Sequence, residues 1–140
     1  MLNTTIYDIN RGVKKTDAVG YIRISTNDDK QKYGLDVQIN AIKEYCKDKN
    51  LRLIEVFKDN KSGKSIDRPG IRDLLNYRNK FQILVVYKID RLSRSLFELL
   101  RLIKEDLKGK EVVFLQEGID QRTKEGRLLL HQLASFAEYG

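Results

Sequence analysis

A serine and an arginine stand together where they could act on a phosphate. Ser25 follows the apolar stretch 18–24, and Arg23 lies within that stretch, two residues before the serine. Alternate residues of a strand point to the same side, so the two side chains are predicted to share one side. A serine hydroxyl can act as a nucleophile, and a guanidinium offers a fixed fork of donors to phosphate oxygens. The pair therefore indicates phosphoryl transfer.

More charged residues follow the other apolar runs of the chain. Arg68 lies in the loop after residues 51–59. A cluster of three charged residues follows the run 81–89, namely Asp90, Arg91 and Arg94. If these runs form parallel strands, their carboxyl ends open on the same edge of the sheet. A serine hydroxyl and up to four guanidiniums would then converge there, and the guanidiniums would stabilise the charge of a phosphate under attack.

Each of these residues could also have an ordinary structural role, and the sequence alone does not decide between the two interpretations. The polar run 25–28 would make a turn or a helix cap. Arg91 and Arg94 could lie on the solvated first turn of a helix that Asp90 caps. An arginine inside an apolar strand, however, requires a reason. Arg23 is therefore the residue that favours the catalytic interpretation.

Other catalytic schemes fit the sequence poorly. His131 is the only histidine, so a Ser-His-Asp relay is not available, and we assign His131 a structural role. The run 62–65 resembles the end of a P-loop, but that motif needs a glycine where Lys58 stands. The acidic residues that could in principle hold a divalent ion have no spacing that favours one: Asp28, Asp59 and Asp90. We therefore expect metal-free chemistry and no cofactor.

Strands and helices alternate in the predicted elements. The hydrophobic patterns predict strands over 18–24, 51–59, 81–89 and 111–116, and helices over 35–50, from Pro69, over about 95–107 and over 126–139. This alternation predicts an α/β fold with a mainly parallel central sheet flanked by helices. The last helix has an unusually wide apolar surface, which indicates packing against a helix of another subunit: Leu128, Leu129, Leu133, Phe136 and Ala137.

The composition is that of one basic globular domain. Of the 140 residues 41% are hydrophobic, and 27 lysines and arginines against 20 acidic residues give a net charge of +7. Such a balance is expected of a protein that meets nucleic acid, but it identifies none by itself. The single cysteine, Cys46, is predicted to be a core residue, and no apolar run is long enough to cross a bilayer. We expect a cytoplasmic protein with an N-terminal extension over 1–17 and a domain over 18–140.

Several dispersed motifs occur in a fixed order. They are Tyr21-Ile22-Arg23-Ile24-Ser25-Thr26, Leu35-Asp36-Val37-Gln38, Ser62-Gly63 with Asp67-Arg68-Pro69-Gly70, Lys88-Ile89-Asp90-Arg91-Leu92-Ser93-Arg94-Ser95, and Gly126-Arg127-Leu128. Together they resemble the resolvase/invertase catalytic domain of serine recombinases, roughly over residues 18–139. The twelve residues between Ser25 and Gln38 resemble the large serine recombinases of phages and mobile elements more than small resolvases.

The resemblance implies a reaction and a role for each motif residue. Ser25 would attack a DNA phosphodiester to form a 5′-phosphoserine linkage and release a 3′-hydroxyl, and strand exchange and reversal would rejoin the DNA. The phosphate would be bound by Arg23, Arg68, Arg91 and Arg94. Gln38 would help to position it, and Asp90 would orient arginines or act in proton transfer. The sequence does not identify the general base for Ser25.

The resemblance also implies partners. Serine recombinases bind double-stranded DNA as homodimers and cut it within homotetramers, with the helix that begins near Gly126 as their interface. The family pattern continues beyond residue 139 with Glu-Arg, whereas this chain ends at Gly140. We therefore expect a catalytic domain with a truncated interface helix and no DNA-reading domain, which does not cut its site efficiently by itself.

Two alternatives of other classes remain. A non-catalytic basic DNA-binding module would keep its function when Ser25 is replaced by alanine. A metal- or nucleotide-dependent enzyme on a flavodoxin-like sheet would lose activity with a chelator or would require added nucleotide.

Overall fold

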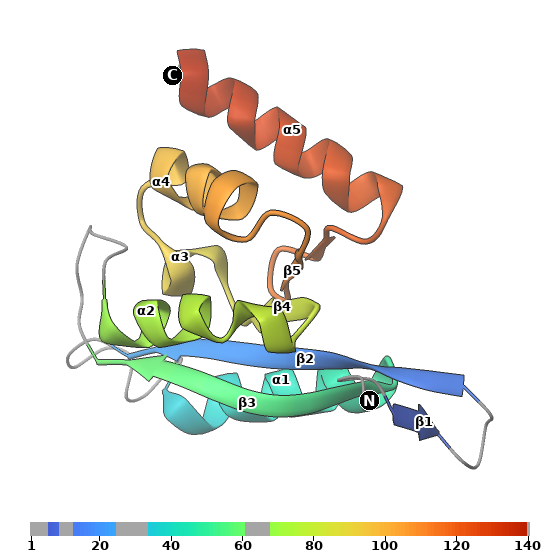
Figure 1. Ribbon diagram of the computed structural model, residues 1–140. Helices are drawn as coiled ribbons and strands as arrows, with labels where there is room; N and C mark the ends of the chain where they lie inside the picture. The colour runs from blue at the N-terminus through green and yellow to red at the C-terminus, as the bar shows by residue number, and fades with distance from the viewer. Residues whose placement is uncertain (1–5, 9–12, 25–33, 61–67, 140) are drawn as a thin grey trace.

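A central sheet separates two layers of helices in the computed structural model, which describes residues 6–8, 13–24, 34–60 and 68–139 (Figure 1). The four parallel strands are neighbours in the order β3 (Leu51–Asp59), β2 (Val13–Arg23), β4 (Ile83–Val86) and β5 (Glu111–Phe114). Two short strands pair antiparallel, β6 (Ile119–Asp120) with β5 and β1 (Ile6–Asp8) with the start of β2. The predicted α/β fold with a mainly parallel sheet is confirmed.

Strand β2 lies inside the sheet and separates two apolar cores by its alternation. Ala18 and Ile22 face the core under α1 (Leu35–Asp48), and Val19 and Tyr21 face the core on the other side. By the same alternation Arg23 points to the side of Tyr21. Strand β4 is buried along its whole length, as the continuous apolar run 83–86 predicts for a parallel strand with both faces covered.

The helices cover the sheet unequally. Helix α1 lies on one face, whereas α2 (Pro69–Asn76), α3 (Ile89–Leu92) and α4 (Leu96–Arg101) lie on the other (Figure 1). A 3₁₀ turn, η1 (Arg78–Lys80), follows α2. Helix α5 (Lys124–Tyr139) packs on α4 and ends at the far side of the molecule from α1 (Figure 1). In the described part of the chain, no helix has the length and apolar character needed to cross a membrane.

The strand expected over 81–89 is β4 over 83–86, with Ile89 already in α3, and the elements expected over 18–24 and 95–107 differ more. Strand β2 begins at Val13, five residues before the expected start at Ala18, because Asp17 is buried and paired with Arg52 of the neighbouring strand at 2.6 Å. The helix expected over 95–107 is instead α4 followed by a π-helical segment, η2 (Leu102–Asp106), in which the N–H of Leu107 reaches the carbonyl of Leu102. The division of the chain at residue 17 stays a prediction.

Candidate active site

Arg23 is the last residue of β2 and lies fully buried at the carboxyl edge of the sheet. Its guanidinium donates from Nε to the backbone carbonyl of Arg91 at 3.1 Å and from Nη2 to the backbone carbonyl of Asp90. Because a buried charge must be hydrogen-bonded to be tolerated, these carbonyls at the start of α3 explain how an arginine ends an apolar strand. The strand and α3 are thereby tied together.

Gln38, in the first turn of α1, acts on Arg23 through the backbone. Its Oε1 accepts from the N–H of Arg23 at 3.3 Å, and its Nε2 donates to the carbonyl of Arg23 at 3.0 Å. The amide thus satisfies both backbone groups, as a neighbouring strand would. Gln38 is fully buried. The role in positioning a phosphate, expected from the resemblance, stays a prediction, and the observed contacts are with the arginine that would bind it.

Arg68 precedes α2 and is buried with two hydrogen-bond donors to spare. Its Nη2 donates to the carbonyl of Leu92, and its guanidinium carbon lies 5.8 Å from the centre of the Tyr21 ring. Its Nε and Nη1 are buried and have no hydrogen-bond partner among the residues that the structure describes. Unsatisfied donors of a buried cation are costly, at about 1–3 kcal/mol each or more. An anion bound beside Arg68 would satisfy them.

Asp59, the last residue of β3, organises the segment that carries Arg68. It accepts from the hydroxyl of Tyr21 at 2.7 Å and from the N–H groups of Gly70 and Ile71 at 2.8 and 3.2 Å. Burial and this hydrogen bond raise the pKa of Tyr21. A Cβ at Gly70 would meet the carbonyl of Lys58 at 2.5 Å, so only glycine allows the approach of α2.

From sequence alone, Asp59 is considered only as a possible metal ligand. The signal for its structural role is an aspartate at a strand end that precedes a Pro-Gly helix start, because a carboxylate suits the N–H groups of a helix N-terminus.

Helix α3 presents the other charged residues at the same edge. The guanidinium of Arg91 is buried and donates from Nη1 to the carbonyl of Arg23 at 3.4 Å and from Nε to the carboxylate of Asp90 at 3.1 Å. Asp90 is partly exposed, and Lys88 lies 4.0 Å from its other oxygen. Glu117 accepts from the N–H of Ile89 with both carboxylate oxygens at 3.2 Å and so holds the start of α3.

The four arginines form one electrostatic cluster. Burial, together with the neighbouring charges of Arg68, Arg91 and Arg94, lowers the pKa of Arg23. Arg94 is exposed at the rim, whereas the other three are buried. The structure therefore brings together the arginines predicted to converge, and it adds a backbone frame made of carbonyls and the Gln38 amide.

Ser25 lies outside the described residues, as do Asp28 and the run 62–65. The described chain reaches Ile24, whose N–H donates to the carbonyl of Asp59 at 3.1 Å. Strand pairing thus continues to the residue immediately before the serine. Cys46, predicted to be a core residue, is buried on the side of α1 that faces the sheet, whereas His131 is exposed on α5 rather than packed in a core.

The chain that carries this cluster is similar to a known protein family. The family described as "Resolvase, N terminal domain" matches residues 18–140. The chain is a resolvase-family serine recombinase domain. The likeness read from the motifs is therefore confirmed at the level of the family.

Known relatives of this resolvase domain are longer proteins. It is 38% identical over 121 residues to DNA-invertase hin of Salmonella typhimurium and 36% identical over 122 residues to serine recombinase gin of Escherichia phage Mu. Each alignment covers 86% of this chain and 58% of the relative, so the chain spans just over half the length of these relatives. Among solved structures, the N-terminal catalytic domain of TP901-1 integrase matches with a TM-score of 0.81 and 29% identity, over 88% of this chain and 95% of that domain.

Proposed function

We propose that this domain cuts and rejoins double-stranded DNA through a covalent bond between Ser25 and a backbone phosphate. The observation that carries the proposal is Arg68, a buried cation with two donors that have no partner among the described residues. It lies in a cluster of four arginines at the sheet edge where the chain runs into Ser25. A phosphodiester would supply the missing acceptors and two partial negative charges to this cluster.

The proposed reaction is a transesterification. The Oγ atom of Ser25 attacks phosphorus, the bond from phosphorus to the 3′ oxygen breaks, and the 3′ oxygen takes up a proton to leave as a hydroxyl. The serine proton passes to an acceptor, and the phosphate remains linked to the 5′ end and to Ser25. The reverse attack by a 3′-hydroxyl restores both the DNA and the serine. The number of phosphoester bonds stays constant, so no external energy is required.

We assign two kinds of role to these residues, contact with the phosphate and positioning of the residues that contact it. Arg68 has donors without a partner in the described part of the chain and Arg94 is exposed, and both are proposed to contact the phosphate and to stabilise charge on its oxygens. Arg23 and Arg91 supply buried positive charge and lock β2 to α3. Gln38 holds the backbone of Arg23, and Asp90 orients Arg91. The acceptor of the serine proton is not assigned.

The test uses a protein in which this domain is extended with the remaining part of a longer relative such as serine recombinase gin, together with a nicked suicide substrate that traps the covalent intermediate. Wild-type protein should yield a denaturation-resistant adduct that maps to Ser25 by peptide mass spectrometry. Ser25→Ala should yield none while it still shifts the DNA in a gel. An adduct of undiminished yield with Ser25→Ala would refute the proposal. Full function of that variant in recombination would instead favour the non-catalytic DNA-binding module.

The apolar residues exposed on α5 support an assembly of several subunits. Leu128, Leu129 and Phe136 are 58%, 40% and 70% exposed, while Leu130 of the same helix is buried against the core. Exposed apolar residues on a helix that also has a packed side indicate a partner surface. We propose that this surface forms homodimers and, in the active complex, homotetramers. We further propose that this chain, which spans just over half the length of its relatives, cuts poorly by itself, and a comparison of its adduct yield with that of the extended protein would test this.

The subgroup is a separate proposal. The spacing between Ser25 and Gln38 and the likeness to the TP901-1 integrase domain favour a large serine recombinase of the integrase group. Hin and Gin, at 38% and 36% identity, favour the other possibility, an invertase-like recombinase. A plasmid assay distinguishes the two, since an integrase joins two different sites on separate molecules. Inversion between two like sites on one molecule would overturn the integrase proposal.

A further inference from the structure

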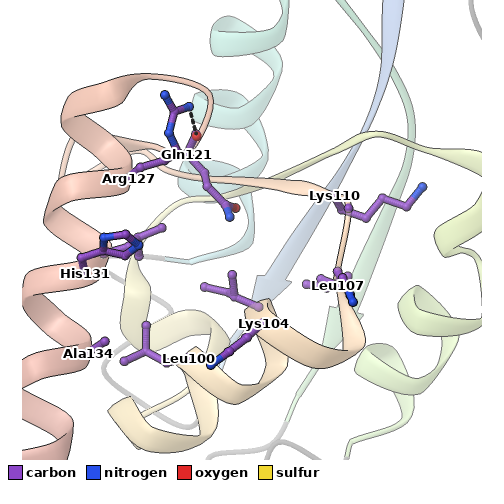
Figure 2. Close-up of a pocket in the computed structure, with 12 residues that line it drawn as sticks. Leu100, Lys104, Leu107, Lys110, Gln121, Arg127, His131 and Ala134 are labelled. Carbon is purple, nitrogen blue, oxygen red and sulfur yellow. Dashed lines mark hydrogen bonds between the residues drawn. The ribbon is translucent and has the colours of Figure 1, made fainter.

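A cavity away from the arginine cluster lies between part of α5 and the segment formed by α4 and η2 (Figure 2). It has a volume of about 410 Å³, which falls within the usual range of ligand sites. Its walls are α4 with η2 on one side and α5 on the other, and it opens beside the turn 108–110 that leads into β5. Since that turn is at the amino end of a parallel strand, the cavity lies at the sheet edge opposite Arg23.

The lining combines an apolar floor with polar groups that donate hydrogen bonds. The floor consists of Leu100, Ile103, Leu107, Leu130 and Ala134. Lys104 and Lys108 come from the η2 side, and neither forms an ion pair with an acidic side chain in the part of the chain described. No acidic residue is among the described residues that line the cavity.

The opposite wall adds further donors. His131 and Arg127 come from α5, and Arg127 donates to the carbonyls of Gln121 and Arg122 at 3.2 and 3.1 Å, so its positive charge stays fixed near the rim. The Oε1 of Gln121 accepts from the N–H of Val112 at 2.9 Å, which leaves the Nε2 of that amide as a donor. Figure 2 shows His131 and Ala134 on one wall facing Leu100 and Lys104 on the other.

We infer that this cavity binds an acidic peptide segment of a partner protein, with an apolar side chain on the floor and carboxylates on both walls. The charge pattern decides among ligand classes. A fatty acid would present one anionic end, whereas the cations here stand on two opposite walls. DNA would present phosphates but nothing for the apolar floor. A segment in which acidic residues flank leucine matches both features.

The wall on the η2 side supports a functional rather than an incidental cavity. Residues 102–106 form a π-helix, a rare element that is frequent at functional sites. Ile103 and Lys104 of this segment and Leu107 directly after it all line the cavity. A peptide bound there would contact both α4–η2 and α5. The partner would therefore act on the direction in which α5 leaves the domain, independently of the reaction proposed for Ser25.

The experiment measures binding of a fluorescein-labelled peptide by the chain, using fluorescence anisotropy. The probe carries a central pair of leucines flanked on each side by glutamates. Control peptides replace either the leucines by serine or the glutamates by glutamine. We expect saturable binding of the probe that weakens with added salt, and weak binding of both controls. Absence of saturable binding, or equal binding of the serine control, would overturn the inference.

Variants locate the site. Lys104→Gln with Lys108→Gln should weaken binding about fivefold, which corresponds to modest exposed ion pairs. Lys43→Gln with Lys47→Gln, a matched pair on exposed positions of α1, should leave binding unchanged. Ala134→Leu should fill the cavity and abolish binding without a change of charge. Equal effects of the two lysine pairs would overturn the inference.

Competition and spectroscopy complete the test. Dodecanoate or duplex DNA that displaces the probe more effectively than the unlabelled peptide would assign the cavity to a lipid or a nucleic acid and overturn the proposal. Self-association of the chain that Ala134→Leu abolishes, without peptide binding, would assign it to a second copy. Amide chemical shifts should move on peptide addition at Gly109 and Ala134, which keeps the result readable even if a variant folds poorly.

Discussion

The carboxylate of Asp59 should carry a large part of the stability of the domain. It is buried and accepts three hydrogen bonds, from the hydroxyl of Tyr21 and the N–H groups of Gly70 and Ile71. Asp59→Ala would leave three donors without this acceptor. Hydrogen bonds to a charged group contribute about 1.5–3 kcal/mol each, and water can reach some of the helix N-terminus, so we expect a loss of about 4 kcal/mol. That is a substantial share of the roughly 5–15 kcal/mol typical of a domain.

Two further variants divide this loss between the partners. Tyr21→Phe removes one donor and leaves the carboxylate bound to α2, so its expected cost is about 1 kcal/mol. Asp73→Ala, at an exposed aspartate of α2, should change stability by less than about 0.5 kcal/mol. Urea unfolding of the chain, followed by circular dichroism, measures all three. With a slope of about 2 kcal/mol per molar urea, Asp59→Ala should lower the midpoint by about 2 M.

The reasoning fails if Asp59→Ala costs no more than Asp73→Ala. It also fails if Tyr21→Phe alone costs as much as Asp59→Ala, because the bonds to α2 would then contribute nothing. In the extended protein that carries this domain, Asp59→Ala should additionally reduce adduct formation, since the displaced α2 carries Arg68 at its start.

Three other predictions concern Gln38, Gly126 and Cys46. Gln38→Leu should cost about 2 kcal/mol in urea unfolding, because the N–H of Arg23 loses its acceptor and the Arg23 carbonyl keeps only the longer bond from Arg91, whereas Asn40→Leu on the exposed side of α1 should change little. Gly126→Ala should lower the free energy of unfolding by about 3 kcal/mol, since its Cβ would lie 1.8 Å from the carbonyl oxygen of Asp120. Gly109 has a φ of +84° but open space around it, so Gly109→Ala should cost only about 1 kcal/mol. Equal costs for the two variants would contradict the steric argument. Burial raises the pKa of Cys46 to about 11 from 9.0, so at pH 8 the folded chain should react with iodoacetamide about a hundredfold more slowly than the unfolded chain, and rapid labelling under native conditions would disprove it.

Much of the fold could be predicted from local patterns. The prediction of β3 over 51–59 agrees with the structure residue for residue, and the apolar run around 83–86 is the buried strand β4, because continuous and alternating apolar runs reflect burial directly. The start of β2 was missed because the residues before Ala18 are polar. Their place in the strand depends on Asp17 pairing with Arg52, a contact between residues distant in sequence.

Only part of the candidate site could be predicted from the sequence. Parallel topology brings strand ends to one edge, so the convergence of the arginines could be foreseen from their positions. The frame could not, because the contact of Gln38 with Arg23 and the three bonds of Asp59 depend on how α1 and α2 pack. The pattern over 95–107 predicts a helix but does not reveal its π-helical segment, since a wider turn leaves almost the same apolar spacing.

The way in which Arg23 and Arg68 are held affects how the domain can change in evolution. Their described acceptors are the main-chain carbonyls of residues 90, 91 and 92. Every amino acid provides such a carbonyl, so mutations of the side chain at position 92 cannot remove the hydrogen bond to Arg68, provided that α3 keeps its course. A carbonyl also carries no net charge and leaves the guanidinium's charge uncancelled. Selection at this edge should therefore act on the path of the backbone more strongly than on the identity of that neighbouring side chain.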